Sequence, residues 1–346
     1  MYGNFIYFIL VLLIYLTYQP PEDPTFTGPE SLVLFAGLAL AFAAMTRLMF
    51  RRIERLVGRE NPARLDQLFN AAQLRSSILA VAVFALDIYA LNLPAVVNGP
   101  LLDRWPTLQA LVFLALFVAY LGVVWGCGYD AYRELYLPSF TRREYIASNI
   151  SFSAPILLPW LLLSGVADLI NALPLPAARA FLATSEGQTI YFCVFLAVVA
   201  VTGPVMIKTF WRCRPLKPGL PRERIEALCR RADMTYRDIL CWPLFGGKML
   251  TAGVMGLVRR FRYILVTPSL LGLLAPEEID AVIGHEIGHI KKKHLLFYLL
   301  FFAGYLVLSY VTFDVAVYAL ILAEPVWRLV HRSGSNPGMV TSIVFS

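Results

Sequence analysis

Apolar runs long enough to cross a lipid bilayer dominate this sequence. One helical span needs about 20 predominantly apolar residues, and runs of that kind recur between short polar connections. Hydrophobic residues make up 58% of the chain and charged residues 15%, whereas soluble proteins are about 45–50% apolar and about 25% charged. The sequence predicts a mainly α-helical, polytopic membrane protein, with seven spans at residues 4–18, 31–50, 76–93, 107–126, 150–173, 188–208 and 295–323.

Lysine and arginine are unevenly distributed among the connections. Residues 51–75, residues 127–149 and the stretch after residue 208 are rich in them, whereas residues 19–30 have none. Cytoplasmic connections carry the excess of positive charge, so alternation places the N-terminus and the stretch after residue 208 in the cytoplasm. We expect an integral protein of the cell (inner) membrane. Contact of basic connections with anionic lipid accounts for the net charge of +7, so no nucleic-acid partner is expected.

The longest polar segment follows the sixth predicted span. It divides the chain into a membrane domain at 1–208, a cytoplasmic domain at 209–294, and a last part at 295–346 with the seventh span and the start of a possible eighth. Within 209–294 the residue pattern predicts a small α+β domain, because one amphipathic helix is followed by three strand-like runs. The expected elements are a helix at 221–231 and strands at 233–242, 249–258 and 262–267.

The sequence His285-Glu286-Ile287-Gly288-His289 follows these strands, where a helix is expected. Pro276 stands at the expected helix start, and two glutamates follow it in the first turn. A spacing of four places His285 and His289 on one helix face, one turn apart. Two imidazoles so placed can share one tetrahedral Zn²⁺, and Glu286 can then accept a proton from water. The alternative is a buried helix with two histidines that only make structural hydrogen bonds.

Residues near this motif carry further expectations. His294 lies about 180° around a continuous helix from His285, so we expect it to be structural or interfacial. Gly284 and Gly288 are poor helix formers, and close approach of another backbone would explain them. In the strand expected at 249–258, the edge at Met249–Gly256 could pair with an extended peptide. Its candidate contacts are Thr251, Ala252 and Gly253, and a hairpin that only packs against the helix is an equally weighted alternative.

Acidic residues within apolar spans are functional candidates. We expect Asp87 and Asp314 to lie deep in the membrane, where bonds to neighbouring helices are favoured over a water-filled cavity. Asp168 is expected near the outer surface and solvated. The five cysteines contain no C-x-x-C pair, so reduced thiols are expected rather than disulfides.

Residues 251–294 resemble the integral-membrane zinc metallopeptidases that include the CAAX prenyl endopeptidase and the bacterial heat-shock membrane protease. The matching residues are Tyr263-Ile-Leu-Val-Thr-Pro-Ser-Leu-Leu271, the stretch from Pro276 to Ile290, and His294 before a span. This resemblance implies a gluzincin domain on a helical membrane bundle, with one zinc ion and endopeptidase activity on membrane-associated proteins or peptides.

The chain departs from that family in two places. Thr251-Ala252 stands where the family usually has an Asn-Ala pair. The family's third zinc ligand is a glutamate in a later E-x-x-x-D helix, but Glu324 is followed by Arg328 at the position of the aspartate. We therefore expect a membrane zinc endopeptidase whose chain stops before the third-ligand helix. The alternatives are a catalytically inactive membrane scaffold that keeps the protease fold and, last, a transporter that uses Asp87 and Asp314.

Overall fold

The computed structural model describes residues 3–99, 102, 104–136, 141–174, 176–243, 249–305, 308 and 312. It divides the chain into two compact units, residues 1–283 and residues 284–346. Most of the seventh predicted span lies outside the described residues, and so do Asp314, Glu324 and Arg328.

Five helical segments of the described chain are long and apolar enough to cross a membrane. They confirm the second to sixth predicted spans and run at Gly28–Glu54, Pro62–Ala90, Pro106–Tyr136, Arg142–Ala172 and Glu186–Phe210. The first predicted span forms a helix of only 14 residues, α1 (Gly3–Leu16). The described start of the seventh is the short apolar helix His294–Tyr305. The mainly α-helical membrane fold is therefore confirmed, with five full-length spans described rather than seven.

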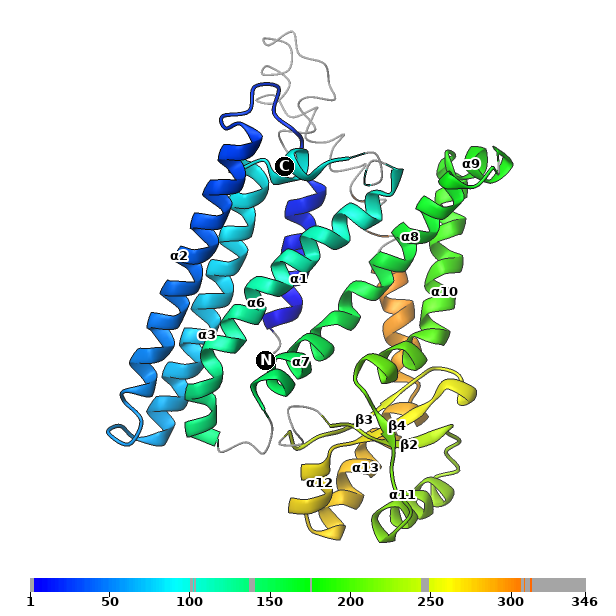
Figure 1. Ribbon diagram of the computed structural model, residues 1–346. Coiled ribbons are helices and arrows are strands. Elements are labelled where there is room, and N and C mark those ends of the chain that lie inside the picture. Colours follow the sequence, from blue (N-terminus) through cyan, green and yellow to red (C-terminus); the bar gives the residue numbers. More distant parts are fainter. Residues whose placement is uncertain are drawn as a thin grey trace, which may run out of the picture. The chain divides into compact units, whose positions relative to one another are not determined.

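Four helices pack side by side around an aromatic core (Figure 1). They are α1, α2 (Gly28–Glu54), α3 (Pro62–Ala85) and α6 (Pro106–Tyr136). The ring of Phe117 meets Phe8 and Phe84 edge to face, at centroid distances of 5.5 and 5.9 Å. Lipid removes the hydrophobic drive between helices, so close packing of this kind holds them together.

Two carboxylates are buried in the membrane part of the chain. Asp87 lies in a π-helical turn, η1 (Leu86–Ala90), where the Tyr120 hydroxyl donates to it at 2.5 Å. This confirms the expected bond to a neighbouring helix. The expectation of a solvated Asp168 is wrong, because its side chain is buried and accepts a hydrogen bond from the Thr107 amide at 2.8 Å. Asp168 thereby satisfies an amide in the first turn of α6, which has no partner within its own helix.

The other described helices that precede the sheet are α4 (Leu93–Val97), α7 (Arg142–Ser153), α8 (Leu158–Ala172), α9 (Pro176–Leu182) and α10 (Ser185–Phe210). A 3₁₀ turn, η2 (Ala154–Leu157), joins α7 to α8. The short helix α9 precedes α10. Another short helix, α4, follows η1. The start of α7 is fixed by a capping box, in which the Thr141 amide donates to the Glu144 carboxylate at 2.7 Å.

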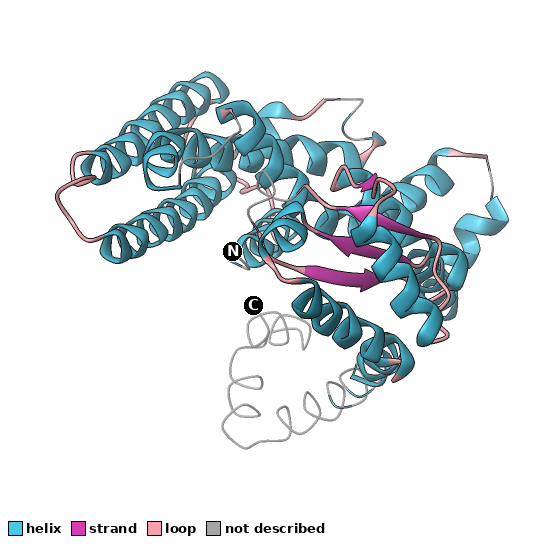
Figure 2. Cartoon of the chain, turned by 90° about the horizontal axis from the view of Figure 1, so that it is seen from below, coloured by secondary structure: helices cyan, strands magenta, loops and turns pink. Residues whose placement is uncertain are grey.

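A four-stranded sheet follows α10, in the order β1-β2-β4-β3 (Figure 2, magenta). Its strands are β1 (Arg214–Pro215), β2 (Asp238–Cys241), β3 (Ala252–Met255) and β4 (Tyr263–Val266). The three predicted strands are confirmed with shorter bounds, and β1 was not predicted. Strand β4 pairs with β2 in parallel and with β3 antiparallel. All four of its residues are buried, as expected of a central strand covered on both faces.

The helices of this domain are α11 (Leu220–Arg231), α12 (Pro268–Leu273) and α13 (Pro276–Lys291), with a 3₁₀ turn, η4 (Arg259–Phe261). Helix α11 buries Ile225 and Cys229, one turn apart, as the predicted amphipathic helix requires. Its Arg224 reaches the first turns of α13, where it binds Asp280 at 2.7 Å and Glu277 at 3.2 Å. This ion pair fixes the start of the helix that carries the histidine motif.

Candidate metal centre

Helix α13 begins at Pro276, with two glutamates in its first turn, as the sequence predicts. The Ala275 amide donates to the Glu278 carboxylate at 2.8 Å, which satisfies one free amide at the helix start. Ile283 and Ile287 are 0% and 5% exposed. These two residues form a buried apolar face one turn long, and the helix has a fixed orientation about its axis.

His285 and His289 lie on one face of α13, as their spacing predicts. Their Nε2 atoms are 3.1 Å apart, and their ring planes are nearly perpendicular. Two nitrogens bound to one tetrahedral zinc at about 2.0–2.1 Å would lie roughly 3.3 Å apart. One ligand atom of each of His285, Glu286 and His289 lies within 4.8 Å of the others. The donor set and its spacing fit Zn²⁺, and the side chains need to move little to hold it.

The three side chains differ in exposure. His285 is exposed, whereas Glu286 and His289 are half-buried. A water molecule or an extended peptide could therefore reach the two ring nitrogens and the carboxylate. Among the described residues, this is the one cluster with the composition of a metal site. Among the described residues, only Glu286 lies close enough to the two histidines to be a third protein ligand.

Two expectations about neighbouring residues are wrong. A Cβ added at Gly284 or at Gly288 would meet no described atom within 4 Å, so no other described backbone approaches them closely. Nothing in the structure explains these glycines. His294 does not lie on the far side of a continuous helix, because α13 ends at Lys291 and the chain turns at Lys293, whose φ is +53°.

This turn brings His294 to the motif. Its Nδ1 atom lies 2.6 Å from Nδ1 of His289, and the two rings are 4.8 Å apart. Histidines that bind a metal through one nitrogen usually donate the other N–H to a second group, which fixes the tautomer and the ring orientation. His294 is in position to accept that proton from His289. One indirect sign of the turn is visible in the sequence, the change from the lysines at 291–293 to an apolar run.

Strand β3 holds two of the residues predicted to contact a substrate, Ala252 and Gly253, and Thr251 directly precedes it. The strand lies at one edge of the sheet and pairs with β4 alone among the described strands. The Thr251 carbonyl accepts a bond from the Thr267 amide at 3.2 Å, and the Thr251 amide donates to the Thr267 hydroxyl. Thr251 therefore faces β4. Because antiparallel strands alternate, Gly253 also faces β4, whereas the amides and carbonyls of Ala252 and Val254 point to the open edge.

Comparison with known proteins adds evidence of family. Residues 222–326 match the model of peptidase family M48. The protease HtpX homologue of Thermoplasma acidophilum is 29% identical over 130 residues, which are 34% of this chain and 40% of that protein. The homologue of Pyrobaculum islandicum is 30% identical over 165 residues, which are 45% of this chain and 46% of that protein. This chain thus spans less than half the length of these curated relatives.

A shorter stretch is more similar. The protease HtpX homologue of Methanocaldococcus jannaschii is 54% identical over 33 residues, which are 10% of this chain and 12% of that protein. The crystal structure of S. mikatae Ste24p aligns with 84% of this chain and 72% of that chain, at 21% identity and a TM-score of 0.40. That score is too low for an inference about geometry. The sequence matches confirm the resemblance to the membrane zinc metallopeptidases, which is carried by residues 222–326 and their match to the model of peptidase family M48.

Proposed function

We propose that this chain acts as a membrane-embedded zinc endopeptidase that cleaves membrane-associated proteins or peptides. The observation that carries the proposal is the 3.1 Å separation of the His285 and His289 Nε2 atoms beside the Glu286 carboxylate. His285 and His289 would hold the metal. Zinc, when bound, supplies a Lewis acid that polarises the scissile carbonyl and lowers the pKa of water.

Glu286 performs the proton transfers in this proposal. Its carboxylate follows the first histidine directly, where it can accept a proton from the attacking water and return it to the leaving amine. His294 would hold the His289 ring in the tautomer that carries its proton on Nδ1 and leaves Nε2 free. The open edge of β3 can add an extended peptide by backbone hydrogen bonds through Ala252 and Val254.

The test separates the base from the metal ligands. The assay uses the purified protein with a single-span reporter that has an unstructured cytoplasmic tail. Glu286→Gln should lower cleavage by about 100-fold to 10,000-fold, the usual contribution of a general base, and leave the metal content unchanged. His285→Ala and His289→Ala should lose both cleavage and metal. Full turnover by Glu286→Gln would contradict the mechanism, and a metal-loaded parent chain that cleaves nothing would favour the inactive scaffold.

The proposed location is the cell (inner) membrane, with the N-terminus and the peptidase segment in the cytoplasm. The unequal charge of the connections supports it: residues 51–75 carry six arginines, whereas residues 19–30 carry neither lysine nor arginine. Reporter fusions at Asn61 and Lys217 should be active in the cytoplasm, and fusions at Asp23 and Gly99 on the opposite side. A cytoplasmic signal at Asp23 would contradict the topology of the first two spans.

A further inference from the structure

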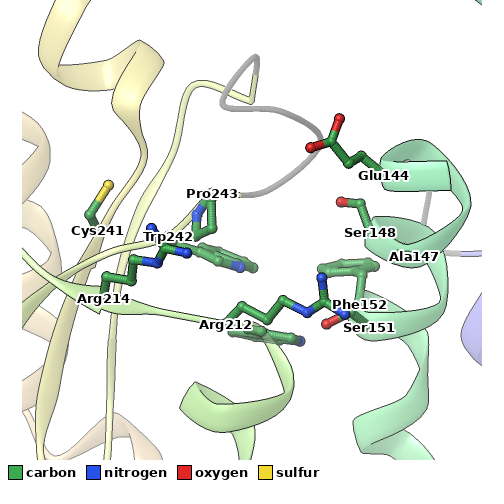
Figure 3. A pocket seen from close by; sticks show the side chains of 11 residues that line it. Glu144, Ala147, Ser148, Ser151, Phe152, Arg212, Arg214, Cys241, Trp242 and Pro243 are labelled. Carbon is green, nitrogen blue, oxygen red and sulfur yellow. The ribbon is translucent and has the colours of Figure 1, made fainter. Parts of the chain in front are cut away.

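A cavity of about 440 Å³ lies where two membrane helices end beside the sheet (Figure 3). Its wall comes from three parts of the chain: one face of α7 from Glu144 to Phe152, the residues that follow α10, and the ends of β1 and β2. The Ser151 hydroxyl on α7 donates to the carbonyl of Phe210, the last residue of α10. The cavity is thus held between two segments that belong to one compact unit.

The position of this cavity along the helices is that of a membrane–water boundary. The candidate span Glu186–Phe210 ends at the cavity, and the candidate span Arg142–Ala172 begins there. The end of the first span and the start of the second therefore lie at the same face of the membrane. The side chains that line it are consequently at the level of lipid headgroups.

Three aromatic rings form one wall. Trp211 and Trp242 stack at a centroid distance of 4.3 Å, with 14° between their planes. Phe152 stacks on the same pair, at 6.0 Å from Trp211 and 6.3 Å from Trp242. Tryptophan is enriched at membrane interfaces, where its ring contacts the upper acyl chains and the headgroups. This wall suits the glycerol and upper acyl region of a lipid.

Two arginines supply the charge. Arg212 and Arg214 both line the cavity and are exposed (Figure 3). No described carboxylate lies within salt-bridge distance of either guanidinium. Glu144 also lines the cavity, but its carboxylate accepts hydrogen bonds from the Thr141 amide and hydroxyl, at 2.7 and 2.9 Å. The described cavity therefore offers two guanidinium groups that no carboxylate neutralises.

The backbone fixes Arg212 at this place. Its φ is +52°, and it follows the last turn of α10. The Arg212 amide donates to the Thr209 carbonyl at 3.1 Å and the Cys213 amide to the Lys208 carbonyl at 2.9 Å. These two bonds form a Schellman cap, whose left-handed residue is usually glycine. A glycine at position 212 would therefore keep the cap and remove only the side chain, which makes Arg212→Gly an unusually clean test.

We propose that this cavity binds the phosphate headgroup of an anionic phospholipid. Arg212 and Arg214 bind the phosphate oxygens, because the planar guanidinium matches phosphate geometry. The stack of Phe152, Trp211 and Trp242 contacts the glycerol and the first acyl carbons. Basic pockets between membrane helices are typical sites for such headgroups. This site is separate from the proposed peptidase chemistry and does not depend on it.

Native mass spectrometry of the purified chain in detergent tests the proposal. The ligands are phosphatidylglycerol, phosphatidylcholine with the same acyl chains, and inorganic phosphate. We expect one saturable phosphatidylglycerol per chain. Each cation near a lipid surface contributes about fivefold in affinity, so Arg212→Gly should weaken binding about fivefold. Arg212→Gly combined with Arg214→Gln should weaken it about 25-fold by the same estimate, whereas Arg212→Lys, which keeps the charge but loses the guanidinium, should weaken it less than Arg212→Gly.

The control is Arg59→Gln, which removes an exposed arginine from the connection between α2 and α3, away from the cavity. It should leave phosphatidylglycerol affinity unchanged. Equal affinity for phosphatidylcholine, or unchanged binding by the double variant, would overturn the proposal. If inorganic phosphate binds as tightly as the lipid, the site takes a free anion rather than a headgroup. An Arg59→Gln effect as large as that of Arg212→Gly would show unspecific attraction by surface charge.

Discussion

Replacement of His294 is the most informative perturbation of the proposed metal centre. Its Nδ1 atom is 2.6 Å from Nδ1 of His289, so a hydrogen bond donated by His289 to His294 would select the His289 tautomer with a free Nε2. His294→Leu removes the acceptor and keeps side-chain volume. His294→Asn keeps an acceptor oxygen close to the position of the original nitrogen.

The size of the effect follows from the kind of bond. A neutral hydrogen bond contributes about 0.5–1.5 kcal/mol net, which is roughly 2-fold to 13-fold in affinity. Loss of an outer partner of a metal-binding histidine usually lowers metal affinity about 10-fold to 100-fold. Because a neutral imidazole polarises His289 less than a carboxylate would, the lower end of that range applies. We expect His294→Leu to bind zinc about tenfold more weakly, and His294→Asn to lie close to the parent protein.

Zinc affinity is measured by competition with a colorimetric chelator at pH 7.5, and the absorption spectrum of the cobalt form reports the geometry of the site. Thermal unfolding in detergent checks that each variant is folded. Two results would refute the argument. One is an unchanged affinity in His294→Leu. The other is an equal loss in His294→Leu and His294→Asn, because the effect would then come from packing rather than from the acceptor.

Three further predictions concern the soluble part of the chain. Val254→Pro removes an amide at the open edge of β3 and should lower cleavage about tenfold, whereas Gly253→Ala, which has space for its methyl group, should not. The Arg224 hydrogen bond lowers the pKa of Asp280, so this carboxylate stabilises the fold at neutral pH and loses its contribution as the pH falls through its folded pKa. Asp280→Asn should therefore lower the melting temperature at pH 7, and the deficit should begin to shrink as the pH falls below about 3.9 and disappear below the folded pKa of Asp280. Ile283 is fully buried, and Ile283→Ala should cost about 2–5 kcal/mol of unfolding free energy by denaturant titration.

The membrane helices could be predicted because each satisfies its own backbone. In lipid, every amide and carbonyl must bond within its own helix, so an apolar run of sufficient length is almost enough to specify the element. Bounds were less predictable. Helix α6 continues to Tyr136, about ten residues beyond the predicted end of the apolar run. Asp130 in this extension pairs with Arg142 at 2.6 Å and with Arg47 at 3.5 Å, partners on other helices that no local pattern identifies.

The contacts of single polar residues were harder to predict, because they depend on residues distant in sequence. Asp168 looked like a solvated carboxylate near a helix end. Its partner is the Thr107 amide, 61 positions away, and only the packed arrangement of α6 and α8 brings them together. Spacing along one helix, by contrast, sufficed for His285 and His289, since the geometry of a single helix sets their separation.

The ends of helices explain the most consequential miss. A glycine after the last turn is the usual signal that a helix stops. Helices α10, α11 and α13 are instead followed by Arg212, Asp233 and Lys293, whose φ values are +52°, +47° and +53°. Such residues cost roughly 1–2 kcal/mol relative to glycine in this conformation, so the sequence analysis assumes a continuing helix at Lys293 and places His294 on its far side. The turn at Lys293 brings His294 to the metal motif, and the turn at Arg212 brings an arginine to the interfacial cavity. Both sites therefore rest on backbone conformations that these side chains disfavour, and local hydrogen bonds at the helix ends, such as those of Arg212 to Thr209 and of Lys293 to Ile290, offset part of that cost.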